Sequence, residues 1–99
     1  MNTNSILILY NSFNLDETTI LSLFNKLCTI YNDTHISSIA IYNYIWTIIG
    51  NDIYNIDNLN IARYIWTNTN LHKKDMFNFN EFEKYVISLK SLLLSLLNI

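Results

Sequence analysis

The chain contains no proline and a single glycine, Gly50, among its 99 residues. β-Sandwiches and barrels need turns rich in these residue types at intervals of roughly 8–12 residues. An all-β fold is therefore disfavoured, and we predict an all-α fold. One glycine also excludes the glycine-rich phosphate-binding loops GxxxxGK[ST] and GxGxxG, because each needs at least two.

Charge is scarce as well. Charged residues make up 14% of the chain, and the formal net charge is −2, whereas globular proteins average about a quarter charged residues. No basic field is available to hold a phosphate backbone, so we do not expect nucleic-acid binding. Cys28 is the only cysteine; it cannot form an intrachain disulfide, which favours an intracellular, cytoplasmic location.

Apolar residues are plentiful, at 51% of the chain, and 14% of the residues are aromatic. This content and the length predict one domain, residues 1–99, with one core. Apolar residues at helical spacing predict helices that begin at Asn14 or Asp16, near residue 39, and at Asp57 or Asn58. Gly50 is the predicted stop of the helix that begins near residue 39. Residues 1–13 contain a short apolar run without the positive start of a secretory signal.

The last helix has the clearest start signal. Asn78 is a natural N-cap, and Glu81 stands three residues later, which completes a capping box. From Phe82 onward an apolar stripe continues to the C-terminal "LLLSLLNI", which is apolar nearly all round. This tail is too short to span a bilayer, which takes about 20 residues. It is buried in the core, docked to a partner, or laid on a membrane surface.

Two loops of the predicted chain share a pattern. In each, one apolar residue, Ile36 or Phe77, immediately precedes a capping residue, Ser37 or Asn78. This order of helices and loops resembles a pair of EF-hands, and we therefore predict two degenerate helix–loop–helix hairpins made of four helices, the last of them apolar. In such a pair, a short antiparallel pairing would join the two loops at Ile36 and Phe77.

The resemblance also bears on calcium. It implies a second loop over residues 70–81, with Glu81 at the position of the bidentate calcium carboxylate. Lys74 stands where an acidic ligand is needed, and the first loop, residues 29–40, ends in Ala40 instead of Glu. We therefore expect a calcium-independent pair with no metal and no cofactor.

Two branches of the family match different parts of the chain. The stretch from "IARYIWTNTN" to "MFNFNEFEKYVISL" resembles the second half of an EH domain. EH domains bind peptides that contain Asn-Pro-Phe, so the resemblance implies that Trp66 is a peptide-pocket residue. The stretch "IWTIIG" resembles instead a calmodulin-like lobe, which implies a relationship to myosin-type light chains.

Both tryptophans lie in a repeated frame, "IYNYIWT" at residues 41–47 and "IARYIWT" at residues 61–67. On a helix the Ile residues of each frame share a face with its Tyr, which leaves each Trp towards the edge. A tryptophan at an edge is either a lid on the core or an anchor for a partner. The partner-binding residues that we expect are Trp46, Trp66, Tyr64, Leu93 and Leu97.

The sequence predicts a non-enzymatic interaction module or small subunit, because no nucleophile, base and substrate site can be named together. The expected partner is an amphipathic helix or a short aromatic-containing peptide held in a groove, with a homo-oligomer through the C-terminal helix as a further option. We expect no nucleic acid and no membrane span. The alternative is a small helical-bundle inhibitor or accessory subunit, viral or otherwise, without any EF-hand relationship.

Overall fold

The computed structural model describes residues 2–28, 34–50 and 54–98, and these residues are mostly helical. The prediction of an all-α fold is confirmed, with five α-helices and one very small sheet in the described part of the chain. In chain order the elements are α1 (Thr3–Ser12), α2 (Glu17–Leu27), β1 (Ile36–Ser37), α3 (Ser38–Ile48), α4 (Ile56–Asn68), the 3-10 turn η1 (Asn70–His72), β2 (Met76–Phe77) and α5 (Phe79–Leu97).

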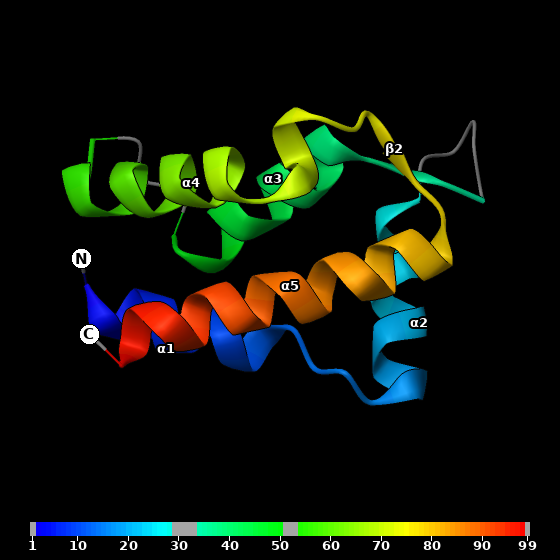
Figure 1. The fold of residues 1–99 in the computed structure, drawn as a ribbon, viewed down its shortest axis with the longest axis horizontal. Helices are drawn as coiled ribbons and strands as arrows, with labels where there is room; N and C mark the ends of the chain where they lie inside the picture. Colours follow the sequence, from blue (N-terminus) through cyan, green and yellow to red (C-terminus); the bar gives the residue numbers. More distant parts are fainter. Residues whose placement is uncertain (1, 29–33, 51–53, 99) are drawn as a thin grey trace.

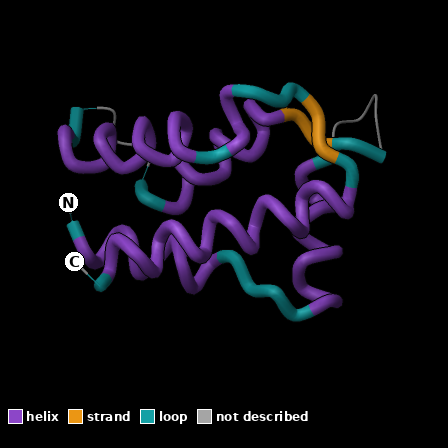
Figure 2. Tube along the Cα trace, viewed as in Figure 1, coloured by secondary structure: helices purple, strands orange, loops and turns teal. Residues whose placement is uncertain are grey.

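The helices form two layers (Figure 1). Helices α3 and α4 make one layer, and α1 and α5 lie side by side in the other. Helix α2 crosses one end of α5, and the two strands lie at that same end (Figure 2). The chain termini lie together at the opposite end (Figure 1).

Most predicted helix ends are confirmed. Asp16 caps α2, Ser37 caps α3 and Asn78 caps α5. Gly50, with φ of +100°, follows the last turn of α3 in the conformation that favours glycine. The predicted start of α4 at Asp57 or Asn58 is wrong, because the side chain of Asn55 accepts a hydrogen bond from the Asn58 N–H and so caps the helix.

The two strands are two residues each and pair antiparallel, with Ile36 opposite Phe77 and Ser37 opposite Met76. One further backbone hydrogen bond extends this contact, from the Ser38 N–H to the Asp75 carbonyl at 2.9 Å. Both loops are therefore joined at the residue that precedes each capped helix. Residues 29–33 of the first loop lie outside the described residues.

Helix α1 was not predicted, and it makes five helices where the sequence predicted four. It carries no acidic residue in its first turn and no basic residue in its last, and five of its ten residues are Thr, Asn or Ser. Its apolar residues Ile6, Leu9 and Phe13 are nevertheless spaced by three and four and are all buried. Packing against α3 and α5 therefore stabilises a helix of poor intrinsic propensity.

A lysine of α5 completes the end of α1. The Lys90 Nζ donates to the carbonyl oxygens of Tyr10 at 3.1 Å and Phe13 at 2.7 Å, and it lies 4.3 Å from the centre of the Tyr10 ring. A cation at the C-terminal end of a helix opposes the negative end of the helix dipole. The C-terminal half of α5 is therefore docked against α1.

The buried apolar side chains of all five helices and both strands form one cluster. Its members are Ile6, Leu9, Phe13, Ile20, Phe24, Ile36, Ile41, Ile45, Trp46, Ile49, Ile61, Ala62, Ile65, Leu71, Phe77, Phe82, Tyr85, Val86, Leu89 and Leu93.

Candidate functional site

The two tryptophans of the repeated frame have different environments. Trp46 is 8% exposed and belongs to the core, whereas Trp66 is partly exposed and packs against the core from outside. Tyr42 joins them: its ring lies 4.9 Å from the Trp66 ring and 6.4 Å from the Trp46 ring, edge-on to the latter. We name Tyr42, Trp46 and Trp66 the aromatic edge.

Tyr42 was missed by the sequence analysis. Tyr42 and Trp46 are four residues apart on α3, so they share a helix face, and this spacing was a usable signal. The contact between Tyr42 and Trp66 joins α3 to α4 and has no local signal. Tyr64, two positions before Trp66, is partly buried and has no ring contact with the aromatic edge among the described residues.

The expected partner residues of α5 lie against the core. Leu93 is fully buried, so its side chain has no surface to offer a partner, and Leu97 is partly buried. Leu94 between them is 45% exposed. The aromatic edge lies on α3 and α4, whereas Leu93 and Leu97 lie on α5 in the other layer (Figure 1).

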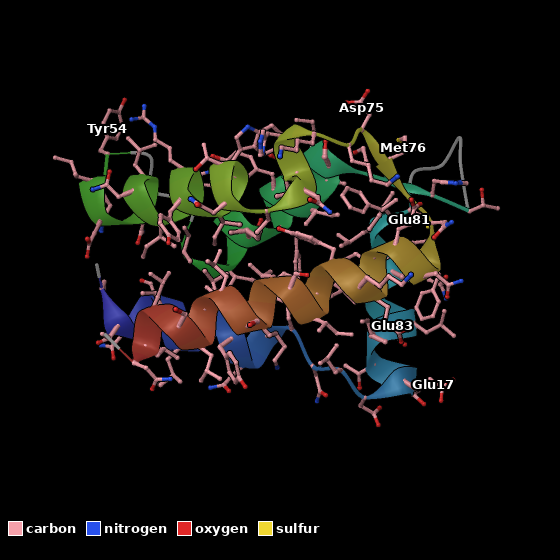
Figure 3. All side chains as sticks on the ribbon, in the orientation of Figure 1. Glu17, Tyr54, Asp75, Met76, Glu81 and Glu83 are labelled. Atoms are coloured by element: carbon pink, nitrogen blue, oxygen red, sulfur yellow. The ribbon has the colours of Figure 1, made fainter. Side chains whose placement is uncertain are left out.

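The two most exposed large apolar residues of the described part of the chain are close together in sequence. Tyr54 is 88% exposed and Ile56, at the start of α4, is 73% exposed. Figure 3 places Tyr54 at the end where both chain termini lie, opposite the end that carries Glu17, Asp75, Glu81 and Glu83. The end of the molecule that carries Tyr54 and Ile56 therefore exposes two large apolar side chains.

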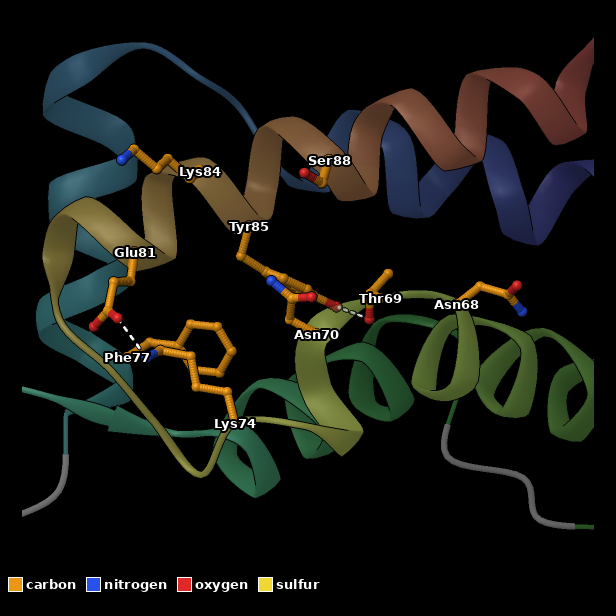
Figure 4. Close-up of a pocket in the computed structure, with 9 residues that line it drawn as sticks. All are labelled: Asn68, Thr69, Asn70, Lys74, Phe77, Glu81, Lys84, Tyr85 and Ser88. Carbon is orange, nitrogen blue, oxygen red and sulfur yellow. Dashed lines mark hydrogen bonds and ion pairs between the residues drawn. The ribbon is translucent and has the colours of Figure 1, made fainter.

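A cleft of about 500 Å³ lies between the end of α4 and the first half of α5 (Figure 4). Its lining residues are Asn68, Thr69, Asn70, Lys74, Phe77, Glu81, Lys84, Tyr85 and Ser88. The rings of Phe77 and Tyr85, 5.6 Å apart, are both buried, and the other lining side chains are polar or charged. None of the residues expected to bind a partner lines this cleft.

Two hydroxyl groups span part of the cleft. The Tyr85 Oη lies 3.2 Å from the Thr69 Oγ1, which donates to the Ile65 carbonyl oxygen at 2.6 Å (Figure 4). Burial raises the pKa of the Tyr85 hydroxyl above its ordinary value of 10.0, and the hydrogen bond with Thr69 opposes this shift in part. At neutral pH the hydroxyl is therefore protonated, and it ties α5 to the end of α4.

Glu81 stands at the mouth of the cleft with both carboxylate oxygens engaged. Its Oε1 accepts from the Asn78 N–H at 2.9 Å, the Asn78 side chain accepts from the Glu81 N–H, and its Oε2 pairs with the Lys74 ammonium. The predicted capping box is confirmed. The hydrogen bond from Asn78, followed by the contact with Lys74, lowers the pKa of the Glu81 carboxyl below 4.5.

A lowered pKa in the folded chain makes stability depend on pH. The charged carboxylate favours the folded state above the unfolded value near 4.5, and this contribution is lost as the pH falls through the folded pKa. Glu81→Gln keeps a capping side chain without a charge. We expect the stability difference between wild type and Glu81→Gln, measured by urea unfolding from pH about 6 to about 3, to shrink as the pH falls. A difference that is constant over this range would contradict the assignment.

Metal ligation was tested over the described residues. Within residues 2–28, 34–50 and 54–98, no three His, Cys, Asp or Glu side chains lie close enough together to hold a metal ion. The Nδ1 of His72, in the second loop, is hydrogen-bonded to the Trp66 carbonyl oxygen at 2.9 Å. It thereby satisfies a carbonyl near the end of α4.

Comparisons with known proteins identify no relative of this chain. No protein-family model, no curated protein and no solved structure matches this chain. Among the helices of the described residues, none combines the length and the apolar character that crossing a membrane requires.

Proposed function

We propose that this chain is a non-enzymatic, calcium-independent protein-interaction module that binds an apolar helix or a short peptide through the aromatic edge. The observation that carries the proposal is the position of Trp66. Its ring is partly exposed and is held 4.9 Å from Tyr42, which is itself only partly buried. Large aromatic side chains that are fixed in place and still reach solvent are typical anchors of protein interfaces, because binding them costs little conformational entropy.

The architecture supports an EF-hand-like origin for this module. Helices α2 and α3 flank the first loop, α4 and α5 flank the second, and the loops pair at Ile36 and Phe77. This pairing is the contact that the resemblance implies. It supports the EF-hand-like origin of the module.

Calcium independence is proposed from the chemistry of the second loop. Glu81, the carboxylate at the calcium position of the resemblance, caps α5 and pairs with Lys74. A divalent cation in this loop would have to displace the Lys74 ammonium and would meet its repulsion. The same two contacts engage both oxygens of Glu81, which supports a non-enzymatic role for this carboxylate.

The proposal is tested by titrating labelled peptides into the purified chain. One probe contains Asn-Pro-Phe, and the other is an amphipathic helix of the kind that light chains bind. We expect saturable binding of one probe and a loss of at least about tenfold in affinity for Trp66→Ala, the size typical of an interface anchor. Tyr54→Ala removes an aromatic side chain that is 88% exposed at the far end of α4, so it should bind as wild type does. If Trp66→Ala and wild type bound the probe with equal affinity, the aromatic edge would be excluded as the binding site.

The second candidate is a small helical-bundle inhibitor or accessory subunit without EF-hand ancestry. Helix α1 favours it, because α1 belongs to neither hairpin and yet packs along α5. A homo-oligomer through α5 also stays a prediction, since Leu94 leaves an apolar surface there. An intracellular, cytoplasmic location is proposed from the lone Cys28, as in the sequence analysis.

A further inference from the structure

Helix α1 packs against α3 and α5 and reaches α4 through one hydrogen bond. We name the surface that these three helices present to α1 the trough. The Phe13 ring, at the end of α1, meets the Tyr44 ring of α3 edge-on at 5.6 Å. Ser5 donates to the side-chain oxygen of Asn58 on α4 at 3.4 Å. Lys90 of α5 holds the last carbonyl groups of α1. One short helix therefore contacts each of the other three.

The apolar face of α1 fills this trough completely. Ile6, Leu9 and Phe13 are at most 1% exposed, and they are spaced by three and four residues. This is the anchor spacing with which an amphipathic helix enters an apolar groove. The structure thus contains an example of what the trough binds: a short helix with three apolar anchors and its C-terminal end at Lys90.

Helix α1 is weakly built as a helix. It has ten residues, and its own sequence places no acidic residue in the first turn and no basic residue in the last. The cation at its C-terminal end, Lys90, comes from α5 and acts only while α1 is docked. Leu7 and Ile8, on its outer side, remain 47% and 52% exposed. Helices of this length are unstable alone. We therefore expect α1 to be helical only while it is docked, so that undocking and unwinding occur together.

The other helices have contacts of their own that do not involve α1. The Phe24 ring of α2 lies 5.5 Å from the Phe79 ring and 5.8 Å from the Phe82 ring, both on α5. The pairing of β1 with β2 joins the two hairpins, and α3 packs on α4. We therefore expect these contacts to hold α3, α4 and α5 together when α1 leaves.

We propose that the trough is a second partner site and that α1 is its built-in competitor. The partner is an amphipathic helix of another protein that presents apolar anchors at α1 spacing and places its C-terminal carbonyl groups, or an acidic side chain there, on Lys90. This site is separate from the aromatic edge and goes beyond the proposed function. Because a tethered segment competes at high effective concentration, the chain binds such a partner in proportion to the fraction of molecules with α1 undocked.

The test uses the full chain and, as probe, a fluorescently labelled peptide with the sequence of residues 2–14. Leu9→Ala in the chain loosens α1 by removing a buried anchor. Asn2→Ala does so without touching the trough, since its side chain only caps α1 through the Asn4 N–H at 2.9 Å. By fluorescence anisotropy we expect Leu9→Ala to bind the probe at least about tenfold more tightly than wild type, and Asn2→Ala about threefold to fivefold.

The controls separate this site from the aromatic edge. Asn11→Ala, on the exposed side of α1, should not tighten binding, a probe carrying Leu9→Asp should not bind, and Trp66→Ala should leave probe binding unchanged. The proposal is overturned if Asn2→Ala, with a wild-type near-ultraviolet circular dichroism spectrum, binds the probe no better than wild type. It is also overturned if the loosened variants form dimers at micromolar concentration, because the occupant is then a second copy of the chain. Neither result affects the Trp66 titration, which tests the proposed function alone.

Discussion

Replacing Asn58 by aspartate is expected to destabilise the chain by about 3 kcal/mol or more at neutral pH. Asn58 is 5% exposed on α4, and its side-chain amide donates to the Ile49 carbonyl at 3.0 Å. Its side-chain oxygen accepts from the Ser5 hydroxyl of α1. Aspartate has nearly the same shape, but it puts an acceptor where the donor was and adds a buried charge. The change therefore tests one hydrogen bond and one charge without changing side-chain volume.

The matched control is Asn60→Asp, which makes the same chemical change at an exposed position two residues further along α4. It is expected to change stability by no more than about 0.5 kcal/mol. Urea unfolding at pH about 7 and again near pH 4 separates the cost of the lost hydrogen bond from the cost of the buried charge. The destabilisation caused by Asn58→Asp should become smaller at the lower pH, because protonation of the aspartate removes the buried charge. If Asn58→Asp and Asn60→Asp lowered the free energy of unfolding equally, the Asn58 side chain would not link α1, α3 and α4.

Replacing Phe82 by alanine is expected to cost about 3–5 kcal/mol, the range for large aromatic side chains in cores. Phe82 is fully buried in the first turn of α5, and its ring lies 5.8 Å from Phe24 of α2. Phe79, three residues earlier on the same helix, lies 5.5 Å from the same Phe24 ring but is only partly buried. Phe79→Ala should therefore cost clearly less, about 1–3 kcal/mol.

The comparison of these two phenylalanines is made by urea unfolding at neutral pH. If Phe82→Ala lowers the free energy of unfolding more than Phe79→Ala does, the contact between α2 and α5 depends mainly on the phenylalanine inside the core. A cost at Phe79 that equals or exceeds the cost at Phe82 would contradict the packing of the two hairpins at this end of the molecule.

Local signals were the most reliable part of the sequence analysis. The capping box of Asn78 and Glu81, the cap at Ser37 and the stop at Gly50 involve residues at most three positions apart, so the sequence contains everything that determines them. The start of α4 was misplaced by a few residues because Asn55, Asp57 and Asn58 all suit a cap. Burial of the Asn58 amide against the Ile49 carbonyl decides between them, and this contact spans nine residues.

Non-local contacts account for what the sequence did not predict. Helix α1 is stable because α3 and α5 cover its apolar face. The helical spacing of Ile6 and Leu9 was a usable local signal, but the contacts that bury them are non-local. The two copies of the Ile-x-x-Tyr-Ile-Trp-Thr frame differ only at the two x positions, Tyr42-Asn43 and Ala62-Arg63, yet Trp46 is buried and Trp66 is partly exposed. Their neighbours decide this difference. Trp46 faces the core between the layers, and Trp66 packs on Tyr42 of the adjacent helix.

The central claim is that the chain binds a helix or peptide at Trp66 without calcium. It is tested most directly by titrating the peptide probe that binds, once with a calcium chelator and once with millimolar calcium, into wild type and Trp66→Ala. The account predicts one binding curve for wild type under both conditions and weak or no binding for Trp66→Ala under either. Saturation that requires calcium, or that persists unchanged in Trp66→Ala, would contradict it.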